Sequence, residues 1–163
     1  MRIVNLTSEG HRLAPTGGCP LEKAKLNEQG PWARYGHSKL ANILFTKELA
    51  SRYPDITTVA LHPGVVKTDL YVPNTTSSMF MRYGMLLFGP LMRTASTGTY
   101  NQLWASTAPK GDLTSGAYYT PIAVLSKPSA YGQDGQMARK LCEYTSLDLW
   151  ASSHQWSRAD SEM

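Results

Sequence analysis

The sequence predicts an α/β fold in which a parallel sheet is covered by helices. An apolar run at residues 3–6 indicates a buried strand, and a β-branched, apolar run at 56–62 indicates a second one. Between them, apolar side chains recur at helical spacing from about Trp32 to Tyr53. A strand, a helix and a strand in this order form a crossover between parallel neighbours, so we expect a parallel sheet.

The first strand begins almost at Met1, with no turn or capping signal before it. A buried strand normally has neighbours on both sides, so we expect that a segment upstream is missing. Prolines and glycines interrupt residues 9–31, which predicts a loop with one short helical turn at 21–27.

Prolines mark both ends of the predicted helix at 32–53. Pro31 suits a first helical turn, and Pro54 disfavours the helical conformation at Tyr53. The second strand stops at Pro63-Gly64. For the rest of the chain we expect a loop at 65–78, an apolar segment at 79–91, a helix at 94–107, a strand at 116–121, a last helix within 132–149 and a polar tail at 151–163.

Composition narrows the class of protein. The 163 residues fit one domain of ordinary size, and the 42% hydrophobic content is too high for a disordered chain. The 16 Lys+Arg and 12 Asp+Glu give a net charge of +4, and the basic residues are scattered along the sequence. We therefore expect no nucleic-acid partner. Two cysteines cannot build a disulfide framework or a multi-cysteine metal site. We expect a cytoplasmic protein without a metal.

Chemistry-bearing residues gather where the two strands end. Tyr35 and Lys39 share one face of the predicted helix, and an ammonium there favours the phenolate, which suits proton transfer. Such a pair on its own is more often ordinary packing. Ser8 follows the first strand, and the second strand ends in the Pro63-Gly64 turn, which Thr68 follows. Ligand sites in parallel sheets lie beyond these carboxyl ends. We therefore expect the groups to converge.

In this order the segments resemble the short-chain dehydrogenase/reductase family. The matching pieces are 2–8, 35–42 and 62–70, and 116–119 resembles a late strand of the branch that includes retinol dehydrogenases and the WW-domain oxidoreductase. The resemblance covers about residues 2–125. It implies an incomplete Rossmann-like, doubly wound parallel sheet, the C-terminal half of the family fold, with helices on both faces, in a partial catalytic domain at 1–150.

The resemblance also implies roles for matched residues. Tyr35 would be the catalytic acid/base, and Lys39 would hold the ribose hydroxyls of the cofactor and favour the ionised form of Tyr35. Ser8 would donate a hydrogen bond to the substrate oxygen; the adjacent Thr7 matches the family position less well. The cofactor would be NADP, or alternatively NAD, and its contacts would be Tyr35, Lys39, Val66 and Thr68.

Other family elements have no counterpart in the sequence: the glycine-rich loop, the selector for the adenosine ribose, the Asn-Asn-Ala-Gly segment and the relay asparagine. Two functions follow. The first is an NAD(P)-dependent oxidoreductase that interconverts an alcohol and a carbonyl on an apolar small molecule, similar to a secondary metabolite, steroid or retinoid. The alternative is a truncated, catalytically inert fragment that acts as a binding or oligomerisation partner.

The segment 79–91 matches the family's substrate lid, and its methionines and aromatics suit an apolar substrate. Packing or a dimer surface explains it equally well. The same segment is compatible with two further interactions, a homo-oligomer and contact with a membrane surface. No serine-hydrolase elbow, metal-ligand spacing or phosphate loop occurs. We expect His37 on the helix surface and His62 at a strand end.

Overall fold

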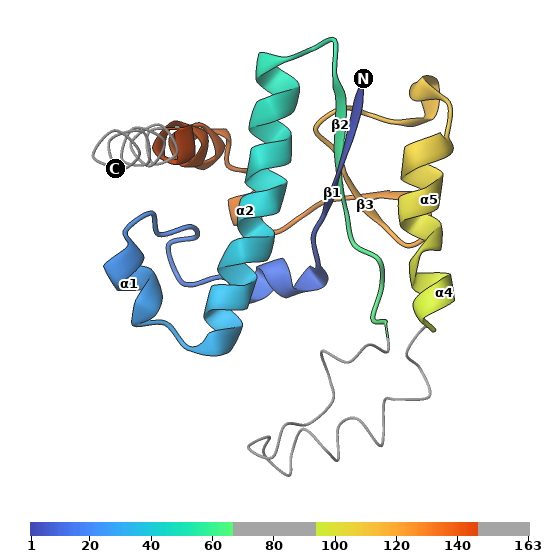
Figure 1. Ribbon diagram of the computed structural model, residues 1–163. Helices are drawn as coiled ribbons and strands as arrows, with labels where there is room; N and C mark the ends of the chain where they lie inside the picture. The colour runs from blue at the N-terminus through green and yellow to red at the C-terminus, as the bar shows by residue number, and fades with distance from the viewer. Residues whose placement is uncertain (67–93, 147–163) are drawn as a thin grey trace, which may run out of the picture.

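The computed structural model describes residues 1–66 and 94–146 (Figure 1). Four strands of this part form one sheet in the order β1-β2-β3-β4. The strands are β1 (Arg2–Leu6), β2 (Thr57–Leu61), β3 (Tyr118–Thr120) and β4 (Val124–Ser126). β1 and β3 both run parallel to β2, as the crossover predicts, whereas β4 pairs antiparallel with β3. The α/β class is confirmed, with one antiparallel strand that the sequence does not predict.

The main helix, α2 (Pro31–Arg52), confirms the helix expected at 32–53. Pro31 occupies its first turn, and Tyr53, which precedes Pro54, forms its C-cap. Leu40, Ile43 and Leu44 are buried on one stripe of the helix, at the spacing that directs side chains to one side. Ile43 packs against the sheet, and Leu40 and Leu44 pack with Cys19 and Ala138. This burial stabilises a helix whose N-cap, Gly30, offers no side-chain hydrogen bond.

The shorter helices refine the remaining predictions. α1 (Lys23–Asn27) agrees with the predicted turn at 21–27, and the predicted helix at 94–107 is α4 (Ala95–Gly98) followed by α5 (Tyr100–Thr107). The helical segment 135–146 lies within the range 132–149 expected for the last helix. A separate short helix that was not predicted, α6 (Ala130–Gln133), precedes it, with Asp134 as its C-cap. The described residues also form two 3₁₀ turns that were not predicted, η1 (Glu9–Leu13) and η4 (Lys110–Asp112).

Helices cover both faces of the sheet, α2 on one side and α5 on the other (Figure 1). Successive residues of β2 serve the two faces: Val59 and Leu61 pack in a cluster with Ala105 of α5, while Ala60 packs with Ile43 of α2. A third cluster joins α2 to the helical segment 135–146 through Leu40, Leu44 and Ala138. This two-sided burial fixes α2 against the carboxyl ends of β1 and β2.

Several predicted features lie outside the described residues: the apolar segment 79–91, Thr68 and the tail at 151–163. None of the helices in 1–66 and 94–146 has the length and hydropathy needed to cross a bilayer.

Candidate functional site

Ser8 lies directly beyond the end of β1 and starts the next turn. It is the N-cap of η1, and its hydroxyl oxygen accepts a hydrogen bond from the Gly10 N–H at 3.1 Å. Serine is favoured at this position because its oxygen satisfies an N–H that the turn leaves without a partner. The preceding Thr7 is buried, and its hydroxyl donates to the Lys39 carbonyl at 2.6 Å. Thr7 therefore ties the strand end to α2, while Ser8 faces the site.

Tyr35 and Lys39 lie one turn apart on α2, as the sequence indicates. The Lys39 Nζ atom lies 5.6 Å from the centroid of the Tyr35 ring, within reach of a cation–π contact. Trp32, one turn earlier, meets the Tyr35 ring edge-on with centroids 6.3 Å apart. The Tyr35 ring is thus held between an aromatic neighbour and an ammonium group.

Gly10 brings Ser8 and Tyr35 together. A Cβ atom added at Gly10 would lie 3.1 Å from Cδ1 of Tyr35 and 3.4 Å from the Ser8 hydroxyl oxygen. Both side chains therefore approach the same small volume beside the Gly10 backbone. The structure brings the predicted Ser8, Tyr35 and Lys39 into one region.

A pocket of about 400 Å³ opens at this place. This volume is in the range of small-molecule sites. Its lining is mostly apolar and comes from the turn after β1, the start of α2 and the loop after β2: Ser8, Glu9, Gly10, Leu13, Pro31, Trp32, Tyr35, His62, Gly64 and Val65. The convergence at the strand ends is as predicted. Glu9 and Trp32 are part of it without having been singled out from the sequence.

Glu9 carries the charge of the pocket wall. Its Oε1 accepts from the Tyr118 hydroxyl and its Oε2 from the Arg12 Nε, both at 2.7 Å. Burial raises the pKa of Glu9, but the hydrogen bonds from Arg12 and Tyr118 outweigh it and leave the pKa lowered. Burial and the contact with Glu9 raise the pKa of the Tyr118 hydroxyl strongly, so it stays a donor.

Asn101 of α5 positions the loop after β2 through two hydrogen bonds. Its side-chain amide donates to the His62 carbonyl at 2.9 Å and accepts from the Ala123 N–H at 3.0 Å. His62 is buried at the end of the strand, as expected. Val66 is half-buried and packs against Gly98, and it is not part of the pocket wall among the described residues.

His37 differs from its prediction as a surface residue. It is half-buried on α2, and its Nε2 lies 3.0 Å from the Pro20 carbonyl and 3.1 Å from the Cys19 Sγ. Burial lowers the pKa of His37 and raises that of Cys19 to about 11, so the pair is a neutral imidazole and a thiol. The loop at 15–20 covers this part of the helix, which helical periodicity alone does not reveal.

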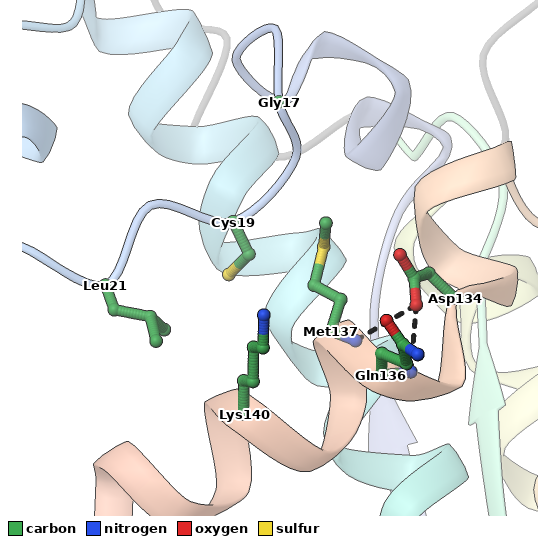
Figure 2. Close-up of a pocket in the computed structure, with 7 residues that line it drawn as sticks. All are labelled: Gly17, Cys19, Leu21, Asp134, Gln136, Met137 and Lys140. Carbon is green, nitrogen blue, oxygen red and sulfur yellow. Dashed lines mark hydrogen bonds between the residues drawn. The ribbon is translucent and has the colours of Figure 1, made fainter.

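Cys19 also borders a smaller pocket of about 240 Å³ (Figure 2). Lys140 and Met137 extend from the helical segment 135–146 toward Cys19 and Leu21, while the Asp134 carboxylate accepts from the backbone N–H groups of Gln136 and Met137. The carboxylate is thus used as a helix cap. No cluster of three or more metal-ligating side chains occurs in the described ranges 1–66 and 94–146.

The mostly parallel sheet with helices on both faces defines the class: a Rossmann-like α/β protein. Its curated relatives include the short-chain dehydrogenase/reductase drtF of Aspergillus calidoustus, 31% identical over 91% of this chain and 50% of that protein. Retinol dehydrogenase 11 of Mus musculus is 36% identical over 95% of this chain and 47% of that protein. The chain belongs to the short-chain dehydrogenase/reductase family.

A solved structure of an uncharacterized protein from Mycobacterium paratuberculosis has the same fold. Its TM-score is 0.59 at 22% identity, over 88% of this chain and 48% of that one. No family model matches the chain. The chain spans about half the length of the curated relatives it matches.

Proposed function

We propose that this chain carries the acid/base half of an NAD(P)-dependent oxidoreductase that interconverts an alcohol and a carbonyl on an apolar small molecule. The observation that carries the proposal is the approach of Ser8 and Tyr35 across Gly10 at the mouth of an apolar pocket, with Lys39 beside the Tyr35 ring. A phenol and a second hydroxyl at one point can hold and protonate the same substrate oxygen.

Each residue has a defined task in the proposed reaction. During reduction, Tyr35 donates its phenolic proton to the carbonyl oxygen, and during oxidation it accepts the proton of the alcohol. Ser8 donates a hydrogen bond to the same oxygen, where negative charge develops. The Lys39 ammonium favours the ionised phenol after proton transfer. The apolar wall formed with Leu13, Trp32 and Val65 holds the body of the substrate and excludes water.

The nicotinamide cofactor fits part of this site. A bound nicotinamide supplies or accepts the hydride. As the family resemblance implies, Tyr35 and Lys39 would hold its ribose side; the Lys39 ammonium lies 5.6 Å from the centroid of the Tyr35 ring. Val66 and Thr68 complete the proposed contacts. We expect NADP, or else NAD, and weak binding by this chain, because its sequence has no glycine-rich loop for the pyrophosphate.

The names of the relatives support an apolar substrate. They include retinol dehydrogenases and a daunorubicin C-13 ketoreductase described as putative, from Streptomyces sp. strain C5. A secondary metabolite, steroid or retinoid fits the same pocket wall. The free thiols Cys19 and Cys142 suit a reducing compartment, so we propose a cytoplasmic location.

The unpaired edge of β1 favours a second candidate function. In the order β1-β2-β3-β4, the outer side of β1 has no partner strand among the described residues. A fragment with such an edge could act as a binding or oligomerisation partner without turning over a substrate.

A comparison of Tyr35→Phe with Tyr53→Phe tests the proposal. Tyr53 is exposed at the end of α2, away from the pocket, so its variant controls for the loss of a hydroxyl. We expect unmodified protein to bind NADPH or NADH in calorimetry and to reduce apolar ketones. Tyr35→Phe should lower kcat by about a hundredfold or more while cofactor binding remains detectable. No detectable cofactor binding by the unmodified chain would contradict catalysis and favour the second function.

A further inference from the structure

Glu9 is the acidic residue among those that line the pocket, and its side chain is 42% exposed. Leu13, Trp32 and Val65 line the same wall, and each is more than half exposed, so apolar surface there is free to contact a ligand. Burying this surface favours an apolar ligand body. A carboxylate at the edge of such a wall needs a donor when a ligand displaces water from it.

The Glu9 carboxylate is held in a fixed position. Tyr118 donates to Oε1 and Arg12 to Oε2, and Tyr118 is itself buried on β3. The Tyr118 ring also meets His11 edge-on, with centroids 5.4 Å apart. A carboxylate oxygen has two acceptor positions, so each oxygen of Glu9 can take one more hydrogen bond.

Arg12 decides which donor suits this acceptor. Its guanidinium is in an ion pair with Glu9 and compensates the negative charge. With its charge compensated, the Glu9 carboxylate still accepts hydrogen bonds, which suits a neutral hydroxyl. The positive charge of Arg12 would repel an ammonium at the same place.

Resting on the proposed function, we infer that Glu9 is a specificity-determining residue that accepts a hydrogen bond from a hydroxyl of the substrate. The substrate class is then an apolar ketone that carries a hydroxyl away from its reacting carbon, or the corresponding diol in the reverse direction. Ser8 and Tyr35 hold the reacting oxygen, and Glu9, the neighbour of Ser8, holds the second one.

Matched ligands test the inference without cofactor or turnover. The probes are the three ring-hydroxylated isomers of acetophenone and their methoxy counterparts, which keep the oxygen but lose the donor. Binding to the 163-residue chain is measured by ligand-observed NMR titration. At least one hydroxy isomer should bind about tenfold more tightly than its methoxy counterpart, as expected for one hydrogen bond to a charged group.

Variants assign the preference to Glu9. Glu9→Leu, which has no acceptor, should remove it, whereas Glu28→Leu, at an exposed glutamate at the end of α1, should keep it. Glu9→Ala also removes the acceptor and serves if Glu9→Leu does not fold. Equal binding of all hydroxy and methoxy pairs, no binding of any probe, or persistence of the preference without the Glu9 carboxylate would each overturn the inference. Tyr35→Phe should leave the preference intact, so this result is independent of catalysis.

Discussion

At the scale of single residues, His11 shows how the turn after β1 is held. It is fully buried, and both ring nitrogens are used. Nδ1 lies 2.7 Å from the Ser8 carbonyl, and Nε2 lies 3.0 Å from the Ser129 backbone N–H. A carbonyl can only accept and an N–H can only donate, so Nδ1 carries the proton and Nε2 is the acceptor. The neutral imidazole thereby joins the turn at Ser8 to the segment before α6.

This arrangement predicts a loss of stability in acid. Burial lowers the pKa of His11 from its ordinary value of 6.5, so the unfolded chain takes up the proton first as the pH falls. The stabilisation is complete above pH 6.5 and is lost progressively below it, toward the lowered pKa of the folded state. The urea midpoint should therefore be lower at pH 5.5 than at pH 7.5, and the drop should be smaller in His11→Asn.

His37→Asn is the matched control, because burial lowers the pKa of His37 as well. That variant should keep the part of the pH dependence that belongs to His11. At pH 7.5, His11→Asn should reduce the free energy of unfolding by about 1–3 kcal/mol, since the Ser129 N–H loses its acceptor. An unchanged pH dependence in His11→Asn would contradict the assignment.

Residue identities in the site were predictable only in part. Ser8, Tyr35 and Lys39 lie in short motifs whose spacing and order place them together. Glu9 was not predictable, because its role depends on Tyr118, which is 109 residues away and reaches it only after β3 pairs with β2. A charged residue next to a strand end is otherwise most often a solvated side chain.

At the scale of elements, α2 has two functions. Its inner stripe packs on the sheet and on the helical segment 135–146, and its first turns present Trp32, Tyr35 and Lys39 to the site. The residues that stabilise the fold and those that line the site therefore lie on different parts of one helix. Substitutions near its middle should change the free energy of unfolding without altering the pocket.

Two adjacent positions of α2 make this testable. Leu44 is fully buried, whereas Phe45 is 41% exposed. Leu44→Ala should lower the free energy of unfolding by about 2–5 kcal/mol through the lost contacts and the cavity. Phe45→Ala should cost about 1 kcal/mol or less, because the higher helix propensity of alanine offsets part of the lost contact. Urea unfolding followed by circular dichroism measures both, and equal losses would contradict the packing described.

Long elements were predictable and short ones were not. The apolar period and the flanking prolines place α2 within a residue of its observed ends. By contrast, β4 has two exposed residues of three, so no buried run marks it, and its pairing follows from the turn after β3. The break at Asp134 arises because its carboxylate caps the next helix, which apolar spacing does not show.

At the scale of the whole molecule, β1 is an edge of the sheet in the part of the chain that the structure describes. Thr57 N–H donates to the Met1 carbonyl and Thr7 N–H to the Leu61 carbonyl, so the odd-numbered residues of β1 face β2. The backbone groups of the even-numbered residues then face away from the sheet. The Leu6 carbonyl accepts from the Asn42 side chain at 2.9 Å, which satisfies part of this edge.

Such an edge favours association with other strands. We expect the weight-average mass in sedimentation experiments to rise above the 18.0 kDa of one chain as concentration increases. Leu6→Lys should reduce the rise, since Leu6 is exposed at the end of the edge strand and a charge there opposes pairing. Leu103 is also an exposed leucine but lies on α5, away from this edge, so Leu103→Lys is the control and should leave the rise unchanged. A concentration-independent mass of one chain would contradict association through this edge.

The pocket also contains its own optical reporter. Of the four tryptophans, Trp150 and Trp156 lie outside the described residues. Trp32 is 53% exposed in the wall beside Tyr35, whereas Trp104 packs against Tyr119 in the core on the far face of the sheet. An indole in contact with water emits at longer wavelength than a shielded one, so a ligand that covers Trp32 should shift the emission to the blue. An aromatic ketone stacked on it should quench the emission. Occupancy of the site can thus be followed by fluorescence without a label.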